Sequence, residues 1–384
     1  MELFRLTEAQ RELAHKVETM ARERFAPRAN EYDGPAIMPK EDILDLHREG
    51  LLLAAAPKAY GGLGFGCEQD DPLSFFLVTE NIAKVNPATG HCYQVHNNCV
   101  QMIHAFGNET QKEKYLEPTR ERAALLPGAG SEPTMHVATG RMLTDAKHVD
   151  GGVMVSGIKH YATNASASEW MWVMVIDEKT ERDLTVMIPS DHPGVTIKEE
   201  FWDPSGVRAC VSPVIEFKEV FVPEEDILGQ PGDFLGNDWL GKINLGFSFN
   251  YLGTMQGIYE HVVNYLKERN RTKDSMRQTY IGEMKARLDA LRLMLYSAVS
   301  GFQADPMGAM LAIEEAKFLA IETANRFQYL VGQACGPTIL FRKYPVERLL
   351  RDLALHGLHG RHYQNAITVG KSELGQPFKV GLSV

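Results

Sequence analysis

The chain has 384 residues, of which 44% are apolar and 23% charged, so it is long enough for two or three domains with a large buried core. Its formal net charge of -10 argues against nucleic acid as the main partner, because phosphate binding relies on clustered Lys and Arg. The sequence has no run of roughly 18 apolar residues and no signal-peptide pattern, which predicts a soluble cytoplasmic enzyme with no membrane partner.

The cysteines are few, odd in number and widely separated. This pattern excludes a disulfide scaffold and contains no Cys-x-x-Cys spacing of a zinc site. Most of these thiols are expected to be buried like small apolar side chains. They are Cys67, Cys92, Cys99, Cys210 and Cys335.

Helical signals fill residues 1–122, which are predicted to form an N-terminal α-helical domain. Thr7 and Gln10 have the spacing of a capping box, and apolar residues follow at helical spacing until Pro27, where the first helix is expected to end. Further helices are predicted from Pro39 to Gly50, from Pro72 to about Lys84, from Thr89 to Phe106 and from Asn108 onward.

The glycine-rich run Gly61–Gly66 resembles a nucleotide-binding loop. The dinucleotide motif, however, requires a strand before the loop and a helix directly after it, whose N-terminus meets the phosphates. Here the acidic segment Cys67–Pro72 follows and would repel phosphate. A plain glycine-rich loop is therefore favoured, and we find no NAD(P)H site of the chain's own.

The helix predicted over Thr89–Phe106 is polar in its first half, which includes His91, Tyr93 and His96. A core helix would be apolar at these positions. The two histidines either pack at a domain junction or line a pocket. The sequence leaves both alternatives open.

After Pro127 the apolar period changes from helical to strand-like, and residues 123–232 are predicted to form a small central β domain. Short β-rich runs are separated by Gly, Pro, Asp and Asn, which favours a compact antiparallel barrel or sandwich. The runs are Gly152–Ser156, Trp170–Ile176, Leu184–Ile188, Val195–Lys198 and Val214–Phe217.

Residues 233–384 return to helical spacing and are predicted to form a C-terminal four-helix bundle. The predicted fold class is therefore α+β, with a helical domain, a β-barrel domain and a bundle in that order. The four bundle helices are expected over Leu240–Lys267, over Gln278–Gly301, over Ala309–Leu330 and from Tyr344–Pro345 onward.

Five short motifs in this order resemble the acyl-CoA dehydrogenase superfamily over nearly the whole chain. The resemblance implies a flavin, FAD or FMN, held between the β domain and the bundle. It also implies a homotetramer or dimer in which a neighbouring subunit completes the cofactor site. The motifs are Val95–Asn97, Ser131–Pro133, Gly157–Asn164, Glu219–Pro223 with Ile227–Gly229, and Tyr344–Asp352.

The resemblance also implies roles at the flavin for single residues. Ser131 matches a hydroxyl position, and Gly128 and Gly130 leave the backbone bare beside the ring. Tyr161 matches the aromatic residue that stacks beside the isoalloxazine, and Thr163 matches the donor near its N5 atom. Contacts to a neighbouring subunit's cofactor are implied for Arg271, Gln333 and Gly336.

Two positions depart from the dehydrogenase pattern. A dehydrogenase needs a carboxylate that removes the proton beside the thioester carbonyl. The place of this carboxylate in the last helix falls in His359–His362, where Gly360 cannot be a base, and its second known place, on the first bundle helix, holds Ile243 followed by Asn244. An acyl-CoA dehydrogenase with this sequence would need a relocated base.

The last helix is similar instead to the reduced-flavin-dependent monooxygenases of the superfamily. This similarity places His359 toward the flavin, where it would hydrogen-bond the oxygen adduct with help from His96 and Ser131. His356, His359 and His362 are spaced to share one side of a helix. They could also complement the dipole at the helix C-terminus, or hold a metal, although nearby carboxylate ligands are not evident.

The favoured prediction is a monooxygenase that receives reduced flavin from a separate flavin reductase and activates oxygen in a buried site. The alternatives are an acyl-CoA dehydrogenase with a relocated base and a flavin-binding protein without turnover. The substrate is expected to be a small molecule that the sequence does not identify. The residues expected to line its pocket are His91, Tyr93, Tyr251 and His356.

Overall fold

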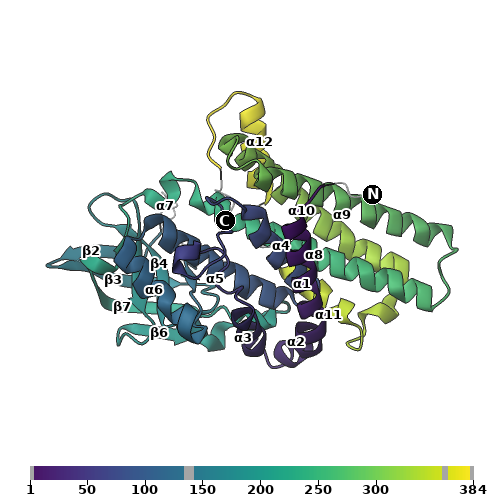
Figure 1. The fold of residues 1–384 in the computed structure, drawn as a ribbon, viewed down its shortest axis with the longest axis horizontal. Coiled ribbons are helices and arrows are strands. Elements are labelled where there is room, and N and C mark those ends of the chain that lie inside the picture. Colours follow the sequence, from purple (N-terminus) through teal and green to yellow (C-terminus); the bar gives the residue numbers. More distant parts are fainter. Residues whose placement is uncertain (1–3, 134–141, 357–361, 381–384) are drawn as a thin grey trace.

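The computed structural model describes residues 4–133, 142–356 and 362–380. It places helices in the first and last thirds of the chain and a β sheet between them (Figure 1). In this view the strands gather on the left and the long C-terminal helices extend to the right. The predicted α+β class is confirmed.

The N-terminal part is helical, and its first helix begins at the predicted cap. Thr7 Oγ1 accepts a hydrogen bond from the Gln10 N–H at 3.2 Å, and Gln10 Oε1 accepts one from the Thr7 N–H at 3.0 Å. These are the reciprocal bonds of a capping box. The helices are α1 (Glu8–Met20), α2 (Ala26–Asp33), α3 (Lys40–Arg48), α4 (Pro72–Ala83), α5 (Pro87–Phe106) and α6 (Glu109–Arg122).

The expected helix end at Pro27 is wrong. Between α1 and α2 the chain makes a π-helical turn, Ala21–Phe25, and Pro27 lies in the first turn of α2. Proline is tolerated in a first turn because its missing N–H would have no helical partner there. The π-helical turn interrupts the α-helical hydrogen-bond pattern just before the proline. A new α-helix can therefore begin there, and the chain stays helical to Asp33.

Helices α4 and α5 lie at the centre of the molecule, where α4 is buried along its whole length. The Gly61–Gly66 run is a loop that precedes α4 and packs on the chain just before it. A Cβ atom at Gly62 would lie 2.0 Å from the carbonyl oxygen of Ala56, so glycine allows a close backbone approach here. This packing explains the glycine without a ligand.

The central part forms one sheet with strand order β6-β7-β3-β2-β4-β5-β8, and β1 pairs with β4. Most neighbouring strands are antiparallel as predicted, but β1 and β2 each run parallel to β4. These two parallel pairings join segments that are not adjacent in sequence, which strand periodicity alone does not indicate. The strands are β1 (Gly128–Ala129), β2 (Asp145–Val149), β3 (Gly152–Lys159), β4 (Trp170–Asp177), β5 (Asp183–Pro189), β6 (Val195–Lys198), β7 (Val214–Pro223) and β8 (Ile227–Leu228).

The C-terminal part is a bundle in which α9 and α10 pack on each other and on α8, α11 packs on α8, and α12 packs on α10. The last predicted helix is described in two parts: α11 as far as His356, and α12, which projects above the bundle in Figure 1, from His362. The helices are α7 (Asp233–Gly236), α8 (Trp239–Glu268), α9 (Ser275–Ser300), α10 (Pro306–Cys335), α11 (Pro345–His356) and α12 (His362–Glu373).

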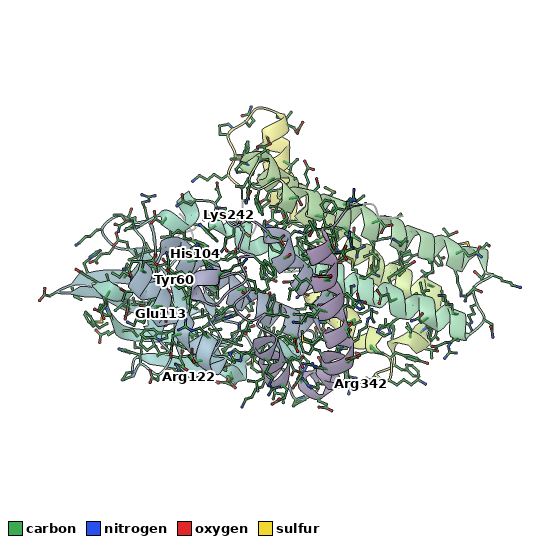
Figure 2. The ribbon with its side chains drawn as sticks, viewed as in Figure 1. Tyr60, His104, Glu113, Arg122, Lys242 and Arg342 are labelled. Atoms are coloured by element: carbon green, nitrogen blue, oxygen red, sulfur yellow. The ribbon has the colours of Figure 1, made fainter. Side chains whose placement is uncertain are left out.

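Charged side chains lie mostly on the surface of the protein. Arg122, for example, joins the end of α6 to Glu169 ahead of β4, with 3.0 Å between Nε and Oε1 (Figure 2).

The five cysteines are all buried and free, as the sequence predicted for most of them. In the described ranges, no helix combines the length and apolarity needed to cross a membrane, and no group of His, Cys, Asp and Glu side chains is arranged to hold a metal.

Candidate functional site

Two segments far apart in sequence lie side by side where β1 and β3 end. The His160 N–H donates to the carbonyl oxygen of Ser131 at 2.9 Å. The Lys159 ammonium donates to the carbonyl oxygen of Gly130, with Nζ at 3.3 Å. The two stretches predicted to hold the flavin ring, Gly128–Ser131 and Tyr161–Thr163, are therefore brought together.

A buried ion pair holds these segments in place. The side chains of Lys159 and Glu132 are 0% and 1% exposed, and Nζ lies 2.7 Å from Oε1. The Glu132 carboxylate also accepts the N–H groups of Leu143 and Thr144 at 2.5 and 3.0 Å. Burial alone would raise the pKa of Glu132, but the Lys159 charge and these donors hold it below its ordinary value.

The backbone around the glycines leaves space beside the strand. A Cβ atom at Gly128 would meet Cys99 Sγ of α5 at 3.5 Å, and one at Gly130 would meet Met174 Cε at 3.6 Å. Both are ordinary contacts, so neither glycine is crowded by its surroundings. The side chain of Ser131 lies at the surface directly after them. Bare backbone beside an exposed hydroxyl fits the polar edge of a flavin.

Tyr161 combines strain with exposure. Its φ of 57° lies in the left-handed region, which non-glycine residues adopt at a cost of roughly 1–2 kcal/mol. Its side chain is nevertheless 63% exposed, so little packing within the subunit offsets that strain. An aromatic ring held outward in this way fits stacking against a planar ligand. The position agrees with the stacking role implied by the resemblance.

Thr163 is buried at the centre of a polar cluster that joins three elements. Its Oγ1 lies 3.0 Å from Nε2 of His91 on α5 and 2.6 Å from Oγ of Ser212 in the loop before β7. Asn164 strengthens the junction because its Nδ2 donates to the carbonyl oxygen of Cys92 at 2.9 Å. Of the residues predicted to line the substrate pocket, His91 thus lies directly beside a predicted flavin residue.

The other predicted residues of α5 are more deeply buried. His96 Nδ1 accepts the Leu126 N–H at 2.9 Å, and burial lowers the pKa of His96 to about 3. A histidine that stays neutral and accepts a backbone donor holds the chain ahead of β1, so a role in proton exchange is not supported by its surroundings. Tyr93 and Tyr251 are also buried, and burial raises the pKa of each phenol.

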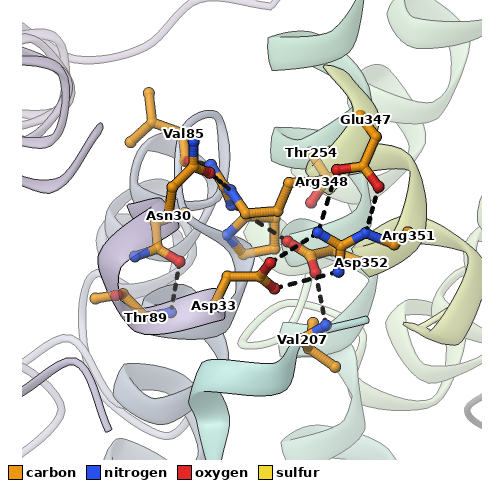
Figure 3. Close-up of polar contacts among 12 residues, drawn as sticks. Asn30, Asp33, Val85, Thr89, Val207, Thr254, Glu347, Arg348, Arg351 and Asp352 are labelled. Carbon is orange, nitrogen blue, oxygen red and sulfur yellow. Dashed lines mark hydrogen bonds and ion pairs between the residues drawn. The ribbon is translucent and has the colours of Figure 1, made fainter. Parts of the chain in front are cut away.

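The loop that carries Ser212 is fixed from α11 by a charged network that the sequence did not predict (Figure 3). Asp352 accepts the Val207 N–H at 2.6 Å, and Arg351 donates to the carbonyl oxygen of Ser205 at 2.7 Å and pairs with Asp33 of α2 at 2.7 Å. The motif Tyr344–Asp352 therefore joins the bundle, the β domain and the N-terminal helices. Its role in positioning the loop is visible only in three dimensions.

The residues predicted to reach a neighbouring subunit's cofactor lie elsewhere. Arg271 follows α8, while Gln333 and Gly336 lie at the C-terminal end of α10, at the end of the bundle far from the sheet (Figure 1). Burial raises the pKa of Cys335 to about 11, and the charges of Arg277, Arg271 and Arg269 oppose this shift. The single chain therefore holds two separate groups of predicted cofactor residues.

The three predicted histidines fall on both sides of a gap in the described residues. His356 ends α11, His362 begins α12, and His359 lies outside the described residues. His362 faces α10, where its Nε2 lies 3.3 Å from Oε1 of Glu322. The second predicted carboxylate position, Ile243 of α8, is apolar, and its carbonyl oxygen accepts Asn98 Nδ2 at 3.1 Å.

Sequence models of one family match three consecutive parts of the chain. The acyl-CoA dehydrogenase N-terminal domain matches residues 7–122, the middle domain 127–220 and the C-terminal domain 245–358. The chain belongs to the acyl-CoA dehydrogenase superfamily. It is thus a flavin-dependent oxidoreductase, and both the superfamily recognised from the five motifs and the flavin cofactor are confirmed.

Relatives come from both branches of this superfamily. The short-chain-specific acyl-CoA dehydrogenase of Megasphaera elsdenii is 28% identical over 91% of this chain and 93% of its own. The dibenzothiophene monooxygenase of Mycolicibacterium goodii is 27% identical over 97% of this chain and 94% of its own. The preference for a monooxygenase drawn from the sequence is therefore not supported by these relatives.

Solved structures give the same picture of the fold. Butyryl-CoA dehydrogenase from Megasphaera elsdenii has a TM-score of 0.87 at 26% identity and covers 97% of this chain and 99% of its own. FMN-bound TdsC from Paenibacillus sp. A11-2 has a TM-score of 0.85 at 22% identity, with 97% and 99% covered. At that identity the likeness to TdsC is one of fold alone.

Proposed function

We propose that the chain is an acyl-CoA dehydrogenase, which oxidises the bond next to an acyl thioester carbonyl with its flavin as hydride acceptor. The observation that carries the proposal is the coverage by acyl-CoA dehydrogenase relatives, which align over the bundle as well as the β domain. Neither predicted carboxylate position holds a carboxylate, so the proposal includes a base that lies elsewhere.

The residues that would hold the flavin form two groups. Within one subunit they are the bare backbone of Gly128–Ser131, the exposed ring of Tyr161 and the hydroxyl of Thr163. From a neighbouring subunit they are Arg271, Gln333 and Gly336. The bound flavin supplies the redox chemistry, while these groups bind and orient it. The separation of the two groups within one chain supports a homo-oligomer, which we propose to be a tetramer in the cytoplasm.

The oligomer proposal is tested by light scattering and flavin titration together. Arg271→Ala should weaken flavin binding without altering the secondary structure, because the Arg271 side chain is exposed within one subunit. A monomeric protein that binds flavin with unchanged affinity after this substitution would refute it.

A monooxygenase is the second candidate function. It is favoured by the near-complete alignment with dibenzothiophene monooxygenase and by Ile243 at the site of a base. In this proposal a separate flavin reductase supplies reduced flavin, and His359, with Ser131, holds or moves the proton at the reacting oxygen. His96, which was also predicted for this role, would instead hold the chain ahead of β1 through its bond to the Leu126 N–H.

One pair of experiments separates the two functions. The flavin-loaded protein is first mixed with butyryl-CoA under anaerobic conditions, and bleaching of the oxidised flavin absorbance supports the dehydrogenase. The protein is then reduced with dithionite and mixed with oxygen in a stopped-flow spectrophotometer. A transient absorbing species that lasts for seconds, and is lost in His359→Ala, supports the monooxygenase. Flavin binding with neither response supports a flavoprotein without turnover.

A further inference from the structure

The Thr163 hydroxyl has two hydrogen-bonding neighbours before any ligand is considered. Its Oγ1 lies 3.0 Å from His91 Nε2 and 2.6 Å from Ser212 Oγ, and all three residues are buried. A hydroxyl has one hydrogen to donate and accepts up to two. The direction of these two bonds therefore decides whether the Thr163 hydrogen remains available to a third partner.

The Ser212 side of the cluster has a preferred direction. Cys210 Sγ lies 3.6 Å from Ser212 Oγ, and burial raises the pKa of the Cys210 thiol to about 12. The thiol therefore keeps its hydrogen at neutral pH. Because sulfur is a weak acceptor, the favoured arrangement has Cys210 donating to Ser212 and Ser212 donating to Thr163.

The loop that presents Ser212 is strained and anchored. Val207 and Val211 have φ values of 43° and 26°, although β-branched residues strongly disfavour positive φ. The Val207 N–H is held by Asp352, and a Cβ at Gly206 would lie 2.1 Å from the Arg351 carbonyl oxygen. Strain of this kind persists where the surrounding structure fixes a functional geometry. The Ser212 hydroxyl is thus presented to Thr163 from a rigid support.

His91 completes the arrangement from the opposite side. It projects from α5, and its ring lies 5.4 Å from the ring of Phe247 on α8. Next to it, the carbonyl oxygen of Cys92 accepts Asn164 Nδ2 from the segment after β3. If Nε2 carries the ring proton, His91 donates to Thr163 and the hydroxyl has both acceptor positions filled. If Nε2 is bare, Thr163 donates its hydrogen to His91 and has none left for a ligand.

We propose that His91 is a positioning residue for the flavin reaction: in its Nε2–H tautomer it donates to Thr163 together with Ser212, and so directs the Thr163 hydrogen toward the bound flavin. The inference deepens the proposed flavin site and rests on it. It also assigns Ser212 a matching role. His91 thus acts through Thr163 and needs no contact with the cofactor.

The first test reads the tautomer without a cofactor. Protein labelled with ¹⁵N-histidine is examined by two-bond ¹H–¹⁵N correlation spectroscopy, which distinguishes Nε2–H from Nδ1–H rings. The His91 signal is identified by its loss in His91→Gln. An Nε2–H ring is expected, and an Nδ1–H ring with a bare Nε2 would overturn the proposal.

The second test measures the midpoint potential of the bound flavin. A donor to flavin N5 stabilises the oxidised form, because N5 carries a hydrogen of its own in the reduced form, so a weaker Thr163 bond makes the flavin easier to reduce. His91→Leu is expected to favour the reduced form about tenfold, which is about 30 mV toward positive potential for a two-electron couple. His91→Gln, whose amide can still donate to Thr163, should stay close to the wild-type value.

Two further variants make the outcome unambiguous. Ser212→Ala removes the other donor and should shift the potential in the same direction, even if His91→Leu does not fold. The control is His104→Leu, roughly 20 Å further along α5, which should leave the potential unchanged (Figure 2). Unshifted potentials in both site variants would overturn the inference and leave the flavin site standing. Absence of flavin binding in the wild-type protein would instead reject the proposed function.

Discussion

The buried pair of Lys159 and Glu132 offers a sharp test of how the candidate site is built. Lys159→Met keeps most of the side-chain volume but removes the charge that faces Glu132. The carboxylate would then keep its two backbone donors, Leu143 and Thr144, without a counter-charge. Removing one partner of a buried pair costs roughly 3–5 kcal/mol, because the remaining charge stays buried and unpaired.

The pH dependence of this loss has a definite sign. In the wild-type protein the pKa of Glu132 is held below 4.5, so its contribution is present above that pH and is lost as pH falls. In Lys159→Met burial is no longer opposed by the ammonium, so the folded-state pKa of Glu132 rises above its unfolded value. Folding then favours the protonated acid, and the variant should lose stability as pH rises from about 4 to 7.

Urea unfolding followed by circular dichroism measures the effect at several pH values. Lys159→Met with Glu132→Gln should regain at least about 2 kcal/mol over the single variant, since the amide still accepts the backbone donors without a buried charge. The control is Lys285→Met, which removes an exposed pair with Asp289 and should change stability by about 0.5 kcal/mol or less. A loss below about 1 kcal/mol in Lys159→Met would refute the reasoning.

Three further predictions follow from other parts of the structure. Burial raises the pKa of Asp352 and of Asp42 to about 6, so the free energy of unfolding should fall as pH rises from about 4 to 6. Asp352→Asn should make this fall with pH smaller when it is measured by urea unfolding. Tyr161→Gly should raise the thermal midpoint of the flavin-free protein slightly by relieving the left-handed strain, yet weaken flavin binding in fluorescence titrations. Glu80→Ala should cost roughly 3 kcal/mol in urea unfolding, because it leaves Arg292 without the carboxylate 3.0 Å from its guanidinium.

Features that depend on neighbouring residues were predicted well from the sequence. The capping box at Thr7 forms as expected, and the helix predicted from Asn108 onward also begins with one, because each box involves residues only three apart. Pro27 was misjudged because the effect of a proline depends on its place within a helix, and the π-helical turn before it has no sequence signal of its own. The parallel pairings of β1 and β2 with β4 were missed because strand periodicity carries no information about partners.

The candidate site was predicted only where it follows local motifs. Thr163 and Tyr161 could be predicted as flavin residues because they lie in one short motif, whereas His91 was left between two interpretations. The choice depends on a contact between residues 72 positions apart, which polarity along a helix does not reveal. Ser212 had no signal at all, because a serine in a loop is ordinary until its neighbours are known.

The cluster around Thr163 also explains why residues distant in sequence belong to one site. A hydroxyl directs its hydrogen usefully only if its other neighbours are fixed, and here they come from α5 and from the loop before β7. That loop is in turn held by Arg351 and Asp352 of α11. A substitution in α11 can therefore alter the Thr163 hydrogen bond without contacting it, through displacement of Ser212. The three parts of the chain thus act as one unit around a single hydroxyl, which no part could orient alone.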